Sequence, residues 1–141
     1  MRRVRDQRGS AAIEAAVGVP AFLLFVGLII CGGRVATTHE SLQSAASEAA
    51  RTASIARDAG TATANARAAA ASSVANQHIP CTGVEVEVDT SDFDKQAGQP
   101  GMVTVTVTCR LDLSDLSVPG IPGSKVLSAR MSSPIDTWRQ S

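Results

Sequence analysis

The residues of this chain that first suggest chemistry lie in one short stretch, R-G-S-A-A-I-E, at residues 8–14. Glu14 lies at the edge of a long apolar run, and a charged side chain at the centre of a bilayer costs roughly 2.5–3.5 kcal/mol on insertion scales. A carboxylate in that position is kept when a cation pairs with it. Alternatively, Glu14 lies in the headgroup region of a membrane, where a carboxylate costs little. The segments before and after Glu14 must therefore show whether it pairs with a cation or lies among the headgroups.

The apolar run at residues 10–33 is long enough to cross a bilayer. Its 24 residues would extend about 36 Å as a helix, and the 19 that follow Glu14 approach the ~20 that a membrane span needs. Four arginines precede the run and Arg34 follows it, which predicts a single-pass protein with a cytoplasmic N-terminus and an extracytoplasmic C-terminal region. Gly18 and Pro20 lie inside the run, and because proline removes a backbone hydrogen bond we expect a helix kink there.

Three kinds of N-terminus fit this arrangement. A secretory signal peptide would be cut after the apolar run, near Gly33, and would release a secreted domain. A signal anchor would stay uncut and would hold an extracytoplasmic binding module at the membrane. A prepilin-type leader would be cut before the run at the cytoplasmic face, which leaves the run on the mature protein.

The stretch R-G-S-A-A-I-E-A-A-V-G-V-P resembles the start of TadE-like pseudopilins of the Tad/Flp pilus system. The resemblance implies that a prepilin peptidase cuts after Gly9, removes a basic cytoplasmic leader at residues 1–9 and makes Ser10 the first mature residue. It implies that Glu14 sets the register of assembly by pairing with the amino terminus of a neighbouring subunit. It also implies a minor pseudopilin or assembly factor in the cell membrane or in an extracellular pilus, with other pilin or pseudopilin subunits and the Tad secretion machinery as partners.

Residues 34–59 are rich in alanine and predict a stem helix that continues the membrane span. Small side chains recur there at three- and four-residue spacing, which gives one face suited to close packing: Leu42, Ala45, Ala46, Ala49, Ala53 and Ala56. Gly60 is expected to end this helix at its C-terminal cap. Residues 62–76 then predict a short second helix.

Strictly alternating apolar residues predict two strands, near residues 83–89 and 102–113, and a third strand is expected near 125–132. The polar connection between the first two strands predicts antiparallel pairing. Together with the helices, these strands predict an α+β, pilin-like fold. Its long N-terminal helix would carry an extracytoplasmic head at residues 60–141, with a small antiparallel sheet. Trp138 would pack on this sheet or face a partner.

The register of the first two strands can be tested against the cysteines. Placing the valines on a common face pairs Val84 with Val107 and leaves Cys81 one residue away from Cys109. A bulge at Gly83 would restore the phase, because glycine tolerates such an irregularity. We therefore predict a Cys81–Cys109 disulfide that closes the sheet. A disulfide requires an oxidising compartment, which agrees with an extracytoplasmic head.

Several other functions are not expected from this sequence. His39 and His78 are isolated, no catalytic motif is present, and two cysteines are too few for a metal site, so neither an enzyme, nor a metal site, nor a cofactor is expected. A net charge of zero and an aromatic content of 3% argue against nucleic-acid binding. The alternating acidic residues Glu85, Glu87 and Asp89 predict a solvated strand face, with a bound divalent cation as the less favoured alternative.

Overall fold

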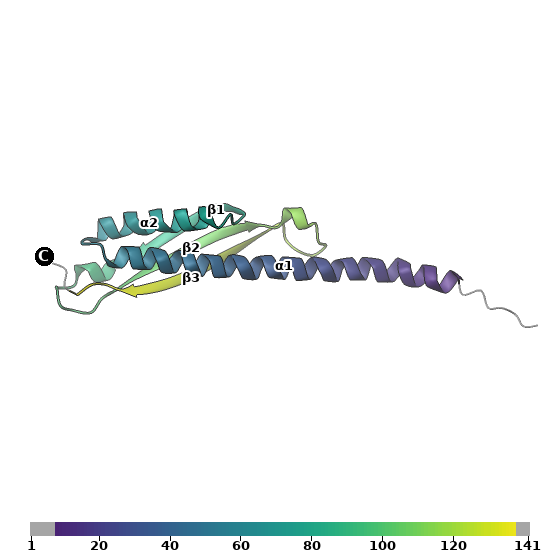
Figure 1. The fold of residues 1–141 in the computed structure, drawn as a ribbon, viewed down its shortest axis with the longest axis horizontal. Coiled ribbons are helices and arrows are strands. Elements are labelled where there is room, and N and C mark those ends of the chain that lie inside the picture. Colours follow the sequence, from purple (N-terminus) through teal and green to yellow (C-terminus); the bar gives the residue numbers. More distant parts are fainter. Residues whose placement is uncertain (1–7, 138–141) are drawn as a thin grey trace, which may run out of the picture.

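The computed structural model describes residues 8–137, which fold into two helices packed on one face of an antiparallel sheet (Figure 1). The sheet has the strand order β1-β2-β3. The elements are α1 (Arg8–Ser54), α2 (Ala59–Asn76), β1 (Cys81–Asp89), β2 (Met102–Asp112) and β3 (Ser124–Pro134). The predicted α+β architecture with a long N-terminal helix is confirmed. Most of the predicted leader, at residues 1–7, and Trp138 lie outside the described residues.

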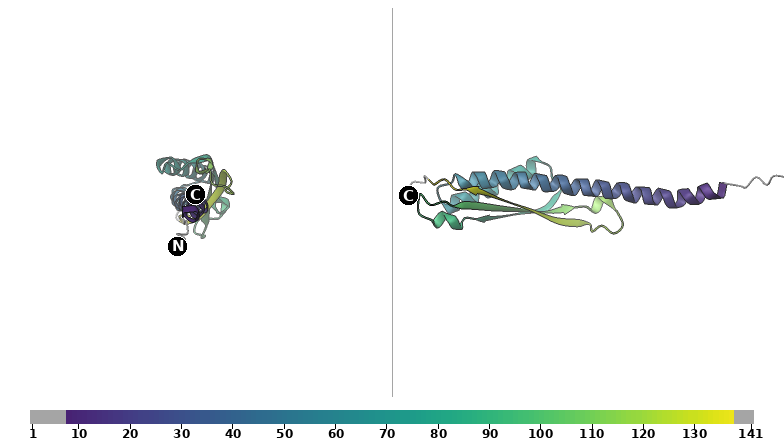
Figure 2. Two further views of the ribbon diagram at one scale, coloured as in Figure 1. Left: turned by 90° about the vertical axis from the view of Figure 1, so that its right-hand side faces the viewer. Right: turned by 90° about the horizontal axis from the view of Figure 1, so that it is seen from below.

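Helix α1 has two different surroundings along its length. Its N-terminal half extends beyond the head, whereas its C-terminal half lies along the sheet and beside α2 (Figures 1 and 2). The C-terminal half buries the small-residue face that the spacing predicted: Leu42, Ala45, Ala46, Ala49 and Ala53. Alanines at these positions let the helix backbone approach its neighbours closely, which explains how so few large side chains can form a core.

Strand β2 supplies the centre of that core because its alternate side chains point at the helices. These side chains are fully buried: Val103, Val105, Val107, Cys109 and Leu111. Paired residues share a face of a sheet, so β1 and β3 direct their alternate apolar residues the same way, as in Val86 and Ala129 opposite Val107. The opposite face of the sheet carries threonine, serine and charged residues, as expected for a sheet with one solvated face.

The register of β1 against β2 differs by two residues from the predicted one. Val84 pairs with Cys109 and not with the predicted partner, Val107. The connection between the strands explains the shift, because Asp92 in the 3₁₀ turn Ser91–Asp94 accepts a hydrogen bond from the Met102 N–H at 2.9 Å. The start of β2 is thereby occupied by this turn and does not pair with β1. Since the shift is even, each side chain keeps its predicted face.

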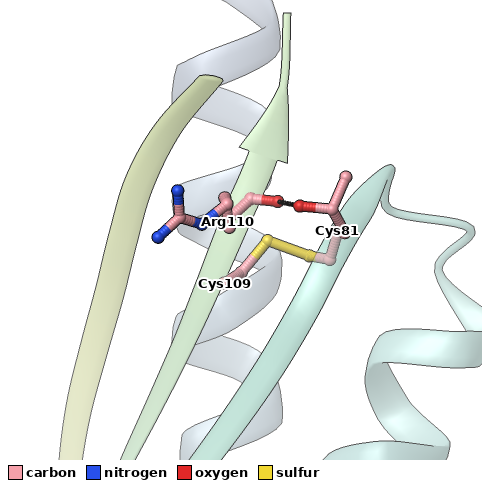
Figure 3. Close-up of a disulfide and its surroundings, with 4 residues drawn as sticks. Cys81, Cys109 and Arg110 are labelled. Carbon is pink, nitrogen blue, oxygen red and sulfur yellow. Dashed lines mark hydrogen bonds between the residues drawn. A yellow bond between two sulfur atoms is a disulfide. The ribbon is translucent and has the colours of Figure 1, made fainter.

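The predicted disulfide between β1 and β2 is present (Figure 3). It joins Cys81 to Cys109 with their Cα atoms 5.6 Å apart. The strand pairing is irregular between Cys81 and Val84, which gives β1 one extra residue there. An irregularity in the segment that contains Gly83 agrees with the predicted bulge, but Cys81 lies opposite Leu111 and not opposite Cys109.

The junction between the helices corrects the prediction that Gly60 ends the stem helix. Helix α1 already ends at Ser54, and Gly60 lies in the first turn of α2. Asp58 caps that turn, because its carboxylate accepts hydrogen bonds from the Thr61 N–H at 2.8 Å and from the Thr61 hydroxyl at 2.7 Å. An aspartate cap satisfies N–H groups that the helix start leaves open. Helix α2 therefore begins at Ala59, earlier than the predicted residue 62.

Replacing Asp58 with alanine is expected to lower the melting temperature by a few degrees at pH 7. The hydrogen bond from the Thr61 N–H, followed by that from its hydroxyl, lowers the pKa of Asp58 below its ordinary value. The stabilisation is therefore present above the ordinary pKa and is lost as the pH falls through the lower folded-state pKa. Circular-dichroism melts should show a clear difference between wild type and Asp58→Ala at pH 7 and a smaller one at an acidic pH below the ordinary pKa of aspartate. An equal difference at both pH values would contradict this assignment.

Candidate functional site

The predicted processing and assembly residues lie together in the first two turns of α1. Gly9 and Ser10 belong to the start of the helix, and Glu14 follows Ser10 by four residues, so positions 10 and 14 share a helix face. Glu14 is exposed. Among the side chains that the structure describes, at residues 11–137, Glu14 takes part in neither of the ion pairs formed by Arg34 and Lys95. The Glu14 carboxylate can therefore receive a cation from outside this part of the chain.

The N-terminal half of α1 has the composition and the exposure of a membrane span. An 18-residue window of this helix has a mean hydropathy of 2.4, and 6% of the window is buried inside the molecule. Its large apolar side chains are exposed along the whole segment: Ile13, Val17, Val19, Phe22, Leu23, Leu24, Phe25, Leu28, Ile29 and Ile30. A helix that is apolar on all sides needs lipid or other helices around it. By length and composition, this helix could span a membrane.

Helix α1 continues through both Gly18 and Pro20, the residues at which a kink is expected. A Cβ atom added to Gly18 would have no atom within 4 Å, so this glycine faces open space. Pro20 lies inside the helix and lacks the N–H that would close the preceding turn. The kink stays a prediction.

A contact between the head and the apolar half of α1 was not predicted. It is made by the connection between β2 and β3, which extends along α1 towards its N-terminus (Figures 1 and 2). A Cβ atom added to Gly27 would lie 2.9 Å from Cγ2 of Val118. The guanidinium of Arg34 donates to both carboxylate oxygens of Asp115, at 2.8 and 2.9 Å. No local pattern could reveal these partners, because 81 residues separate the ion pair.

The described residues bring together no candidate metal site. No group of three or more His, Cys, Asp or Glu side chains among them could hold a metal ion. The solvated face of the sheet carries the exposed acidic residues of β1, which are Glu85, Glu87 and Asp89. The hydrogen bond from the Ser91 N–H lowers the pKa of Asp89, and this group therefore stays ionised in solvent. His39 and His78 are also exposed, as expected.

The candidate site and the small-residue stem thus belong to one continuous helix. Residues 9–51 match the family model of TadE-like proteins. The predicted resemblance to TadE-like proteins is confirmed by this match. The TadE-like match begins at Gly9 and ends at Arg51, so it covers the apolar half and most of the stem but not α2 or the sheet. Neither the curated proteins nor the solved structures contain a match to this chain.

Proposed function

We propose that the chain is a TadE-like minor pseudopilin or assembly factor of a Tad/Flp-type pilus, and that a prepilin peptidase cleaves it after Gly9. The observation that carries this proposal is the helix at residues 9–51. It matches the TadE-like family, exposes an apolar surface on all sides in its first half and presents Glu14 near its start. The chain acts by helix packing and subunit assembly and carries out no catalysis of its own.

Cleavage after Gly9 would give the assembly site its second charge. The new amino group would lie on Ser10, one helical turn from Glu14. Each of these charges alone is costly inside a bilayer. When the Ser10 amine of one subunit meets the Glu14 carboxylate of the next, the two charges compensate each other and fix the stagger between adjacent helices. The exposed apolar half of α1 then packs against other pilin or pseudopilin subunits instead of lipid.

The disulfide and the arginines support one orientation in the membrane. The N-terminal arginines favour a cytoplasmic start. The Cys81–Cys109 bond forms in an oxidising compartment, so the head lies outside the cytoplasm. The chain is therefore a single-pass membrane protein before assembly, and the head is exposed to the Tad secretion machinery and to other subunits.

Intact mass and N-terminal sequencing of the full chain, expressed with and without a prepilin peptidase, test this function. We expect a mature start at Ser10 that requires the peptidase and is abolished by Gly9→Leu. Gly18→Leu is the matched control, because Gly18 faces open space and lies away from the cleavage site. A start at Met1 in the presence of the peptidase would indicate an uncut membrane-anchored binding module. A start near Arg34 would indicate a secreted domain.

A further inference from the structure

We propose that the connection between β2 and β3 is a second membrane anchor, which inserts its tip into the outer leaflet beside α1. The connection comprises residues 113–123, and its tip is residues 116–123 (L-S-V-P-G-I-P-G). This inference rests on the membrane placement of α1 proposed above. The chemical partner is a phospholipid: acyl chains at the tip and headgroups at its base.

The contact with Gly27 sets the depth of the tip. Glu14 and Arg34 bound the uncharged part of α1, and a separation of 20 positions corresponds to about 30 Å of helix, the thickness of a hydrocarbon core. Gly27 precedes Arg34 by seven residues and therefore lies about 10 Å inside that boundary. Val118 lies directly against Gly27. A membrane that covers the apolar half of α1 must consequently surround the tip as well.

The side chains of the tip suit this depth because none of them is charged. Pro119 and Pro122 are exposed, and they would contact lipid. An apolar groove lies between the tip and α1, and its lining includes Pro20, Leu23, Leu24, Gly27, Leu116 and Val118. An uncharged tip beside a membrane helix buries apolar surface in lipid, whereas in water the same surface would stay exposed.

The backbone of the tip also reduces the cost of leaving water. Unpaired N–H groups are costly in lipid, and Pro119 and Pro122 have none. The Ile121 N–H donates to the Val118 carbonyl at 3.2 Å, and the Leu116 N–H donates to a carbonyl of the preceding turn at 3.1 Å. Half of the eight residues of the tip therefore present no unpaired N–H. This pattern fits the boundary between headgroups and acyl chains, which interfacial segments reach at a depth of about 5–10 Å.

Polar groups form a layer directly above the tip. The Arg34–Asp115 ion pair ties the base of the connection to α1. A polar depression beside this pair is lined in part by Thr37, Ser41 and His78. Hydroxyls, an imidazole and a guanidinium at this level suit lipid phosphates and glycerol oxygens. The apolar tip lies below a polar layer, just as the acyl chains of a bilayer lie below its headgroups.

Depth-dependent fluorescence quenching of the full chain in phospholipid vesicles tests this anchor. An environment-sensitive probe is attached to Pro119→Cys in a Cys31→Ser background, where the disulfide protects the other two cysteines. The vesicles contain phosphatidylcholine and phosphatidylglycerol with nitroxides at the headgroup, upper chain or lower chain. We expect nitroxides on the upper chain to reduce the emission about twofold, with a weaker effect from the lower chain. Ser128→Cys, exposed on the outer face of the sheet, should not respond.

A probe at Phe22→Cys separates the anchor from the membrane span. Strong lipid quenching at position 22, without any at position 119, would overturn the anchor and leave the proposed function intact. In that case, quenching of position 119 by aqueous iodide would place the tip in water. Energy transfer between labelled copies that rises with protein density would instead place it on a second copy. Absence of lipid quenching at both positions would overturn the membrane placement as well.

Discussion

Replacing Cys81 and Cys109 together with alanine is expected to lower the free energy of unfolding of the head by about 3.6 kcal/mol. The bond links residues that are 28 positions apart, and without it the unfolded chain regains the entropy of that loop. Domains are stable by only about 5–15 kcal/mol. The lost free energy should be a large part of the total stability here. The helices contribute mainly alanines to the core, and each alanine buries little apolar area.

Urea unfolding of the full chain in detergent micelles, followed by far-ultraviolet circular dichroism, measures this change. Wild-type protein treated with a reducing agent should unfold at nearly the same urea concentration as the double variant. Cys31→Ala is the control, since Cys31 is buried on α1 and takes no part in the disulfide. Equal unfolding midpoints for wild type and the double variant would show that the bond contributes little to stability.

Replacing Ala66 with leucine is expected to destabilise the head by about 1–3 kcal/mol, because the larger side chain adds volume to the packed contact between α2 and α1. Ala66 lies on the buried face of α2 with none of its surface exposed. Helix α2 packs mainly on α1, whose own buried face is also made of alanines. A larger side chain cannot be accommodated there unless the two helices move apart.

The neighbouring Ala68 provides a matched control on the same helix. Ala68 is exposed, so Ala68→Leu makes the same chemical change outside the packed contact and should alter stability by less than about 0.5 kcal/mol. Thermal and urea unfolding of the two variants are compared under the same conditions. Similar losses for both substitutions would indicate that helix propensity, and not close packing, determines the effect.

The recurring small residues also relate the stem to the proposed assembly role. The part of α1 after Arg34 is packed within its own head, whereas the part before it has exposed apolar side chains. Under the proposed function, a subunit built in this way would keep a folded head while its N-terminal half exchanges lipid for neighbouring helices. Stability of the head and assembly of the span can therefore be measured as separate properties.

Features that depend on local, periodic patterns could be predicted from the sequence. The apolar run predicted the N-terminal half of α1, whose apolar side chains are exposed. The alanine spacing predicted the buried face of its C-terminal half, from Leu42 to Ala53. Alternating valines predicted the strands and their faces, and the phase of Cys81 predicted both a bulge and a disulfide. The Asp58 cap is a local signal that was not used: Gly60 suggested the end of a helix, whereas Asp58 caps the start of α2.

Tertiary structure alone decided the register and the position of the connection beside α1. The register depends on how the turn around Asp92 engages Met102, since both candidate registers keep the valines on one face. The contact of Val118 with Gly27 and the pairing of Asp115 with Arg34 join residues more than 80 positions apart. Alternation specifies which face a side chain occupies but not its partner along the strand, and a loop takes its place from the packing of the elements it joins.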